Sequence, residues 1–409
     1  MRGPKVLVLV PYLGGDSPNG ALRTFRTLAR VLAEKGADVT LAGQPASLTW
    51  SGLRRDWVRE SGWSTAPPGV DVMTLRTMKR ASQELTAARG LNGLVQLAET
   101  SLVESPILEF LTTRRIKKLR AQLGPRLTRQ EKAAIGTHWD LVISGWAPFR
   151  TIEYGREIAK RSRAHHAVMP NLHAQDHIHV SSPLRSALAS ASSILTMSND
   201  ELPEQWGLEN RSYRLGGIAQ SWPFTQQDQS DVELIVGDRR YVLVTTPIGA
   251  GAKNRLATIR TIAETIHPKL SVVAVGSGWG SVHAPNIIGV EYVSHGALDI
   301  LISRATAVVV PSCFESYSYL MVDAMAHGVI PIVNRASSAM RSIASESSAA
   351  LLASTPAEFA SAANAIASDT FPREQMQEFA SQWTRRYAST DAFHQAVDHW
   401  LDEECIVCD

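Results

Sequence analysis

The chain has 409 residues, of which 44% are hydrophobic and 20% are charged, and this composition is typical of a soluble globular protein. Its length exceeds what one hydrophobic core usually organises, so two domains are expected. A formal net charge of +2 excludes a strong overall attraction to nucleic acid or to membranes, and only three cysteines exclude a disulfide framework.

The first element expected in chain order is a buried strand at 5–10, within the N-terminal segment MRGPKVLVLVPYLGG. The apolar run is too short for a signal peptide and Pro11 interrupts it, and no other apolar run is long enough to span a bilayer. We therefore expect a cytoplasmic protein. A loop rich in Gly, Pro and Asn follows at 11–20, and the helical spacing of apolar residues then predicts a helix over 21–35.

Short β-branched runs alternate with helical stretches through most of the chain, a pattern typical of parallel sheets with crossover helices. In the first half, further strands are expected at 38–42, 70–75, 140–144, 164–169 and 193–196. The stretch at about 80–135 differs, because it is helical in pattern, basic and poor in strand signals. Apolar periodicity is lost near 220–236, in SWPFTQQDQSDVEL, and we place a domain boundary there.

A second series of the same kind follows this boundary. Strands are expected at 241–245, 271–275, 287–293, 307–310 and 328–333, and helices over about 372–409. The predicted fold class is therefore α/β, with two doubly wound Rossmann-like domains that face each other across a cleft. We expect domains over 1–220, with the basic helical insert at about 80–135, and over 221–375, followed by helices over 376–409 that pack back toward the N-terminal domain.

The most informative segment is PSCFESYSYLMVDAMAHGVIPIV, residues 311–333. It predicts a short polar loop after an apolar strand, a helix that opens near Ser318, and Gly328 as the helix end. Glu315 lies in the loop and Asp323 lies eight residues later, within the helix. Acids near a helix start are common for purely structural reasons. Backbone N–H groups beside carboxylates also suit a phosphorylated ligand that is rich in hydroxyl groups.

Several segments of the second half resemble the retaining glycosyltransferases of family 4, which have the GT-B architecture. The Glu-x7-Glu motif of that family is similar to Glu315 with Asp323, and residues 324–328 keep its Ala-Met-Ala-x-Gly stretch. YVLVTTPIGAGAKNR is similar to the family's strand and Gly-Arg turn with a following Lys. VVAVGSGWG resembles its strand that ends in Gly-x-Gly. ISRATAVVVPSCFES resembles its "alanine-aspartate, apolar strand, Pro-Ser, Glu" run.

The first half carries weaker versions of the same resemblance. NGALRTFRTLARVLAEKGADVT is similar to the family's Gly-Gly loop and first helix, and LHAQDHIHV to the segment with its active-site histidine. SILTMSNDE and RLGGIA stand where the family has an apolar strand ending in Ser and a Pro-Asn-Gly-Ile-Asp stretch. The similarity covers most of the chain, except for about 80–135.

This resemblance implies an enzyme that moves a hexose-like sugar from a nucleotide-diphosphate sugar to an acceptor with retention at the anomeric carbon. It implies no metal ion and no cofactor, and it assigns the donor to residues 221–375 and the acceptor to residues 1–220. Carried over by position, Glu315 would bond the donor sugar, Lys253 would neutralise the departing pyrophosphate, and His173 would lie near the reacting carbon. These three residues are the predicted catalytic set.

The resemblance also implies a set of donor-binding residues. Backbone N–H groups of the segment Ser316, Tyr317, Ser318 and Tyr319 would hold the distal phosphate, and Asp323 would bond the ribose hydroxyls. Gly20 would let the backbone approach the phosphate, because it has no side chain in the way.

Three departures from the family pattern bear on these roles. The family's Arg is missing, since Thr246, Pro247 or Ile248 stands at its position, and Arg23 or Arg255 would have to supply the phosphate contact. An Asp replaces the second Glu of the motif. ESYS replaces the commoner Glu-Gly-Phe-Gly, so that two glycines become serines. A non-catalytic GT-B-like protein that binds a nucleotide sugar or docks a partner is therefore the alternative.

Three other patterns favour a structural role over a metal site or a dinucleotide site. His173 and His177 share helical spacing, but the helical metalloprotease pattern needs Glu where Ala174 stands. Cys405 and Cys408 form a CxxC without a second pair, so we predict no metal site. The glycine-rich loop at 276–280 lacks GxGxxG spacing, which disfavours an oxidoreductase.

The most basic stretch extends from Arg114 to Lys132 and has apolar residues at helical spacing. A solvated helix face is one reading, and contact with an anionic surface is the other, such as the inner face of a membrane or a nucleic-acid backbone. The acceptor class stays open among a glycan, a lipid, a natural product and modified nucleic acid.

Overall fold

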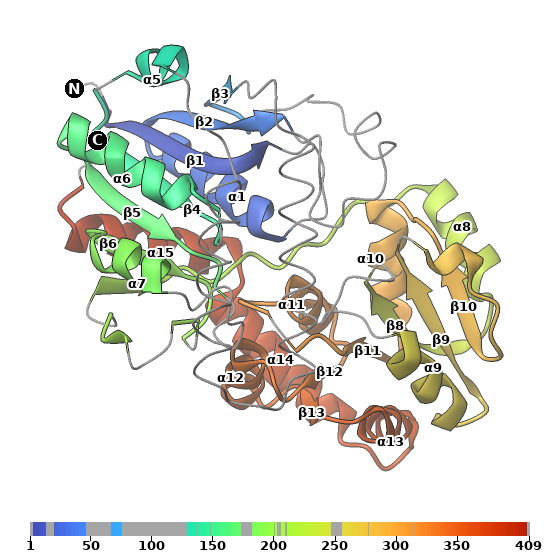
Figure 1. Ribbon diagram of the computed structural model, residues 1–409. Coiled ribbons are helices and arrows are strands. Elements are labelled where there is room, and N and C mark those ends of the chain that lie inside the picture. Colours follow the sequence, from blue (N-terminus) through green and yellow to red (C-terminus); the bar gives the residue numbers. More distant parts are fainter. Residues whose placement is uncertain are drawn as a thin grey trace, which may run out of the picture. The chain divides into compact units, whose positions relative to one another are not determined.

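The computed structural model describes residues 3–13, 20–45, 67–75, 129–136, 138–147, 149–172, 182–199, 201–202, 206–208, 211–246, 256–276, 278–313 and 315–406. The chain forms two compact units (Figure 1). Unit 1 comprises Met1–Leu215 and His394–Asp409, and unit 2 comprises Gly216–Phe393. The returning segment that joins unit 1 therefore begins at His394.

Unit 1 is built on a seven-stranded sheet in the order β3-β2-β1-β4-β5-β6-β7, in which every pairing is parallel. The central strands are apolar on both faces because helices cover both, and the side chains of Val6 to Val10 are completely buried. The strands are β1 (Lys5–Leu13), β2 (Asp38–Pro45), β3 (Val70–Thr74), β4 (Leu141–Gly145), β5 (His165–Met169), β6 (Ser193–Thr196) and β7 (Ser212–Arg214).

The described helices of unit 1 are α1 (Gly20–Glu34), α5 (Arg129–Ile135), α6 (Thr151–Ser162), α7 (Ser182–Ala189) and, from His394 onward, α15 (Thr390–Glu403). Helix α1 buries the stripe of Leu22, Phe25, Leu28 and Leu32, which the apolar spacing predicts. Helix α15 comes from the end of the chain and lies beside β6, where Trp400 is completely buried (Figure 1).

Unit 2 is built on a six-stranded parallel sheet in the order β10-β9-β8-β11-β12-β13. Its strands are β8 (Arg240–Thr245), β9 (Leu270–Val275), β10 (Ile287–Val290), β11 (Ala307–Val310), β12 (Pro331–Asn334) and β13 (Leu351–Ala353). Its helices are α8 (Gln226–Val236), α9 (Leu256–Thr265), α10 (His295–Arg304), α11 (Tyr319–Ala326), α12 (Ser338–Ser347), α13 (Pro356–Ala367) and α14 (Arg373–Tyr387), with a 3₁₀ turn at Trp279–Ser281.

The predicted fold class is confirmed, since each unit is a parallel sheet with crossover helices. Two short strands, β7 and β13, were not expected, because three residues carry too little pattern. Helix α8 lies within 220–236, where apolar periodicity is lost. It forms there because Thr225 and Asp228 make a capping box, which compensates for an apolar face made of little more than Val232 and Val236.

In the part of the chain that the structure describes, no helix combines the length and apolarity needed to cross a membrane. Most of the basic stretch from Arg114 to Lys132 lies outside the described residues, so its contact with an anionic surface stays a prediction.

Candidate functional site

The order in which strands are added to the unit 2 sheet reverses between β8 and β11. From β8 the chain adds β9 and β10 on one side, and it then returns to place β11 on the other side of β8. Loops that follow two such strands run to opposite faces of the sheet and leave a crevice at the carboxyl edge, where ligands bind in open α/β sheets. Strands β8 and β11 are neighbours and parallel, so their carboxyl ends lie at the same edge, and the loop after β11 carries Glu315 there. Residues 247–255, with Lys253 among them, lie outside the described residues.

The loop after β11 has the predicted arrangement. Strand β11 ends at Val310, and α11 begins at Tyr319 with Ser318 at its N-cap position. Glu315 and Ser316 are half-buried at the carboxyl edge of the sheet, ahead of the helix. A carboxylate thus lies a few residues from an open helix N-terminus, which is a combination that can bond sugar hydroxyls and an anion together.

Ser318 has a left-handed backbone, with φ 65° and ψ 83°, and its side chain makes no capping hydrogen bond. It occupies the last position of ESYS, where the resembling family has its second glycine. Glycine adopts this conformation without steric cost, whereas a serine Cβ opposes it. At this position the chain therefore has a backbone conformation that favours glycine, with a residue that disfavours it.

Two of the predicted donor-binding residues are engaged with the start of unit 2. The buried Tyr317 hydroxyl donates to the carbonyl oxygen of Gly217 at 2.9 Å. The N–H of Gln220 donates to Asp323 Oδ1, also at 2.9 Å. The rings of Tyr317 and Tyr319 pack edge to face with centroids 5.3 Å apart. Sequence reasoning did not find these contacts, because the partners are a hundred residues apart.

The carboxyl edge of the unit 1 sheet holds the remaining described candidates. Its order reverses between β1 and β4, and α1 opens at Gly20 on the segment that follows β1. Arg23 lies half-buried in the first turn of α1. The predicted residues His173, Lys253 and Arg255 lie outside the described residues, and their roles stay predictions.

A buried carboxyl group holds the strand ends at Leu172 and Met197, and Leu172 directly precedes the predicted His173 in the sequence. Glu201 accepts the N–H of Leu172 at 2.8 Å and the N–H of Met197 at 2.6 Å, so it joins the chain that follows β5 to the chain that follows β6. Burial raises the pKa of Glu201 to about 8, while hydrogen bonds from the Met197 and Leu172 amides act in the opposite direction. This role was not predicted from the sequence, although Glu201 is the last residue of the SILTMSNDE segment.

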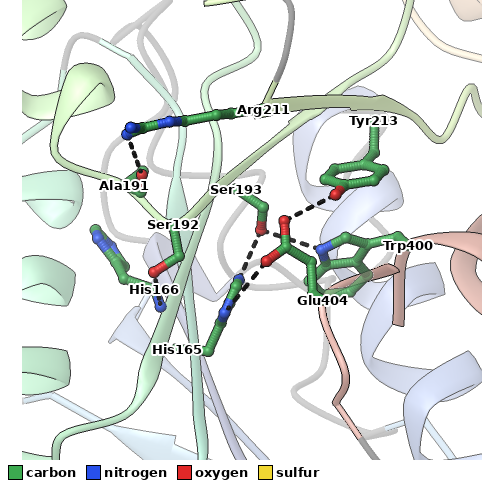
Figure 2. A network of polar contacts seen from close by, with 9 residues as sticks. All are labelled: His165, His166, Ala191, Ser192, Ser193, Arg211, Tyr213, Trp400 and Glu404. Atoms are coloured by element: carbon green, nitrogen blue, oxygen red, sulfur yellow. Dashed lines mark hydrogen bonds and ion pairs between the residues drawn. The ribbon is translucent and has the colours of Figure 1, made fainter. Parts of the chain in front are cut away.

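A second polar constellation lies in unit 1, among β5, β6, β7 and α15 (Figure 2). His165 Nε2 is 2.9 Å from Ser193 Oγ, and His165 Nδ1 is 3.7 Å from Glu404 Oε2. The order hydroxyl, imidazole, carboxylate is that of a hydrolase triad. Ser193, however, is completely buried and also accepts the Trp400 indole N–H at 3.0 Å. A substrate carbonyl cannot reach it, so we assign the constellation to structure.

This network attaches the C-terminal end of α15 to the sheet of unit 1. The Tyr213 hydroxyl on β7 donates to Glu404 Oε1 at 2.8 Å, and burial, followed by this hydrogen bond, raises the Tyr213 pKa to about 12. Burial lowers the pKa of His165, and the Glu404 carboxylate partly opposes that shift. The His165 imidazole therefore lies between the Ser193 hydroxyl and the Glu404 carboxylate.

Within the described ranges, no group of three or more His, Cys, Asp or Glu side chains is arranged to hold a metal ion. The thiols of Cys313 and Cys405 are reduced, and Cys408 lies outside the described residues, as do His173 and His177.

Comparisons with known proteins bear on this site. Residues 250–383, about a third of the chain, match the family model described as "Glycosyl transferases group 1". This segment contains Lys253, Glu315 and Asp323. No curated protein matches the chain at a significant level.

Solved structures are similar over nearly the whole length. The Anabaena protein Alr3699/HepE, solved with UDP and glucose, has a TM-score of 0.59 at 15% identity and covers 98% of this chain and 100% of its own. Sucrose-phosphate synthase from Thermosynechococcus elongatus has a TM-score of 0.65 at 12% identity, with 98% and 99% covered. The trehalose-6-phosphate synthase OtsA has a TM-score of 0.66 at 9% identity, with the same coverage.

The fold is GT-B. At such low identities the likeness to solved structures establishes the architecture of the two units and not their chemistry. The family model adds that residues 250–383, with the Glu315 loop among them, are similar in sequence to group 1 glycosyl transferases.

Proposed function

We propose that this chain is a retaining glycosyltransferase that moves a sugar from a nucleotide-diphosphate sugar to an acceptor without a metal ion. The observation that carries the proposal is the position of Glu315, between the carboxyl end of β11 and the N-terminus of α11, at the reversal point of the unit 2 sheet. The match of residues 250–383 to the glycosyl transferase model supports it. The similarly folded Alr3699/HepE structure, which is a complex with UDP and glucose, also supports the proposal.

The chemistry consists of leaving-group stabilisation and positioning. The bond between the anomeric carbon and the diphosphate oxygen breaks, and the acceptor oxygen bonds that carbon on the same face. The acceptor proton passes to the departing phosphate. In this proposal Lys253 and the N-terminus of α11 stabilise the charge that develops on the diphosphate, which is the role that a cation fills in other enzymes. Glu315 and His173 orient the sugar, and Asp323 bonds the ribose.

A specific observation supports a second candidate, a non-catalytic protein that binds a nucleotide sugar. The family's phosphate-binding Arg is absent, and Thr246 follows β8 directly. A planar guanidinium binds phosphate through two parallel hydrogen bonds, and a single Lys does not reproduce that geometry. Arg23 or Arg255 would have to replace it in an active enzyme.

One experiment separates the two candidates. Thermal unfolding with UDP, GDP, ADP and the corresponding sugar nucleotides identifies the donor, since a ligand at a hundredfold excess over its dissociation constant stabilises by about 2.7 kcal/mol. Hydrolysis of that donor is then measured with and without EDTA, and NMR gives the anomer first released. The enzyme is supported if the donor binds, if its hydrolysis continues in EDTA, and if the sugar first released has the same anomeric configuration as the donor. Binding without turnover supports the second candidate, and absence of binding by any nucleotide contradicts both.

A further inference from the structure

The chain passes from unit 1 into unit 2 along residues 216–222, which we call the connecting segment. Three side chains of unit 2 hold its backbone. Tyr317 binds the carbonyl of Gly217, Asp323 binds the amide of Gln220, and Asp299 on α10 accepts the amide of Trp222 at 3.1 Å. The segment is therefore fixed to unit 2 at both of its ends, by side chains that are themselves buried.

The connecting segment also touches the chain where it leaves unit 2. The amide of Ala219 donates to the carbonyl of Ala388 at 2.8 Å, just after α14. Gly216 has a φ of 68°, and a Cβ there would lie 2.8 Å from the carbonyl oxygen of Tyr387. Only glycine allows both the conformation and this close approach. The segment by which the chain enters unit 2 is thus in contact with the segment that follows α14, before the chain leaves the unit.

Two of the three anchors come from the segment that carries Glu315. Tyr317 is two residues beyond Glu315, and Asp323 is on the helix that this loop opens. The third anchor, Asp299, is on α10 and is bonded to His327 Nε2 at 3.0 Å. A shift of the connecting segment at Gly217 or Gln220 would therefore be transmitted to the Glu315 loop. A shift at Trp222 would be transmitted to α10 and to the end of α11.

We propose that Tyr317 and Asp323 are positioning residues, which hold the Glu315 loop in its donor-binding position by anchoring it to the connecting segment at Gly217 and Gln220. This inference rests on the proposed function, because it assumes that the Glu315 loop binds the donor. It gives Asp323 a second role besides the ribose contact that the family resemblance implies. It also gives a role to the tyrosine hydroxyl, which the Phe of the family's Glu-Gly-Phe-Gly stretch lacks.

The test compares substitutions that separate the anchoring role from ribose binding. Asp323→Asn keeps an oxygen that accepts the Gln220 amide, whereas Asp323→Ala removes it. Tyr317→Phe keeps the buried ring and removes only the hydroxyl group. Asp299→Ala is the matched control, because it removes a buried carboxylate that holds the same segment through Ser221 and Trp222 and has no hydrogen bond with the described residues of the Glu315 loop. Thermal unfolding of each variant reports whether it is folded.

The first readout is amide hydrogen exchange of peptides that cover residues 216–224, measured without ligand. Loss of one hydrogen bond is expected to speed exchange at 217–220 between about twofold and tenfold in Tyr317→Phe and Asp323→Ala, and to leave Asp323→Asn near wild type. In Asp299→Ala the faster exchange is expected at 221–222 instead. Unchanged exchange in both Tyr317→Phe and Asp323→Ala would overturn the proposal.

The second readout is the dissociation constant of the donor identified by the nucleotide panel. Tyr317→Phe and Asp323→Ala are expected to weaken binding between about twofold and tenfold, with Asp323→Asn weakened less and Asp299→Ala unchanged. Equal losses in Asp323→Asn and Asp323→Ala, with none in Tyr317→Phe, would leave ribose binding as the only role and would overturn the proposal. Absence of nucleotide binding by the wild type contradicts the proposed function itself, while the exchange result still tests the anchoring.

Discussion

Trp400 Nε1 donates a hydrogen bond to Ser193 Oγ at 3.0 Å, which joins the last helix of the chain to a strand 207 residues earlier in the sequence (Figure 2). Ser193 lies in β6 and is completely buried, as is Trp400. Lys35 on the turn after α1 also pairs with Asp398 of α15. The C-terminal helix is therefore part of the core of unit 1 rather than an appendage.

Substitution of Trp400 tests this assignment. Trp400→Phe removes the indole N–H and leaves a small cavity, so the free energy of unfolding of unit 1 is expected to fall by about 1–3 kcal/mol. Hydrogen exchange resolved by peptide measures each unit separately. Trp383→Phe is the matched control, because Trp383 is a buried indole of unit 2 whose N–H donates to Glu346 Oε2 at 3.2 Å. The assignment is contradicted if Trp400→Phe speeds exchange in unit 2 and not in unit 1.

The left-handed backbone of Ser318 predicts an unusual response to glycine. Ser318→Gly is expected to raise the free energy of unfolding by about 1 kcal/mol, because relief of an unfavourable conformation outweighs the added flexibility of the unfolded chain. Ser316→Gly is the matched control, since Ser316 is not among the described residues with positive φ. There no left-handed conformation is relieved, so a loss of at least about 0.5 kcal/mol is expected. Chemical denaturation measures both, and equal effects of the two substitutions would argue against strain at Ser318.

The two sheets and the Glu315 loop could be predicted from the sequence, because both follow from local patterns. Apolar runs of four to six residues marked the central strands, and Gly328 marked the end of α11. The contacts of Tyr317 with Gly217 and of Trp400 with Ser193 could not be predicted, because no local periodicity relates residues 100 and 207 positions apart. Helix α8 escaped prediction because its signal is a capping box and not an apolar stripe.

His166 predicts that stability depends on pH. Burial, followed by the positive charges of His165 and Arg156, lowers the pKa of His166 to about 4. The unfolded chain then binds a proton between pH 6.5 and 4 that the folded chain does not bind, so stability is lost as the pH falls through this range. The loss attributable to His166 is about 3 kcal/mol. His165 acts in the same direction, since burial also lowers its pKa.

The measurement is chemical denaturation of wild type and His166→Gln at a series of pH values. A glutamine amide can retain the hydrogen bond that His166 Nε2 makes with Ser144 Oγ at 2.9 Å, and it does not titrate. Because other groups titrate equally in both proteins, the difference in free energy of unfolding isolates His166. This difference is expected to be constant above pH 6.5 and to shrink as the pH falls toward 4. A difference independent of pH would show that His166 is not held neutral.

Under the proposed function, charge stabilisation and sugar contact respond differently to substitution. Lys253→Ala is expected to lower turnover by about 10²–10³-fold, the size typical of removing one preorganised electrostatic group. Lys269→Ala is the matched control, because Lys269 is exposed and precedes β9 at the edge of the sheet opposite to the site. Its turnover is expected to equal that of the wild type, and a loss of less than threefold in Lys253→Ala would remove Lys253 from the mechanism.

Glu315→Ala is expected to lower turnover and also the preference for one sugar over its epimers, because the carboxylate is proposed to bond sugar hydroxyls rather than the diphosphate. Affinity for the nucleotide diphosphate alone is expected to change little, since that ligand has no sugar at this position. Kinetics with paired epimeric donors measure the selectivity, and calorimetry with the diphosphate measures the affinity. Selectivity equal to that of the wild type, with weaker diphosphate binding, would place Glu315 on the phosphate side of the site and not on the sugar.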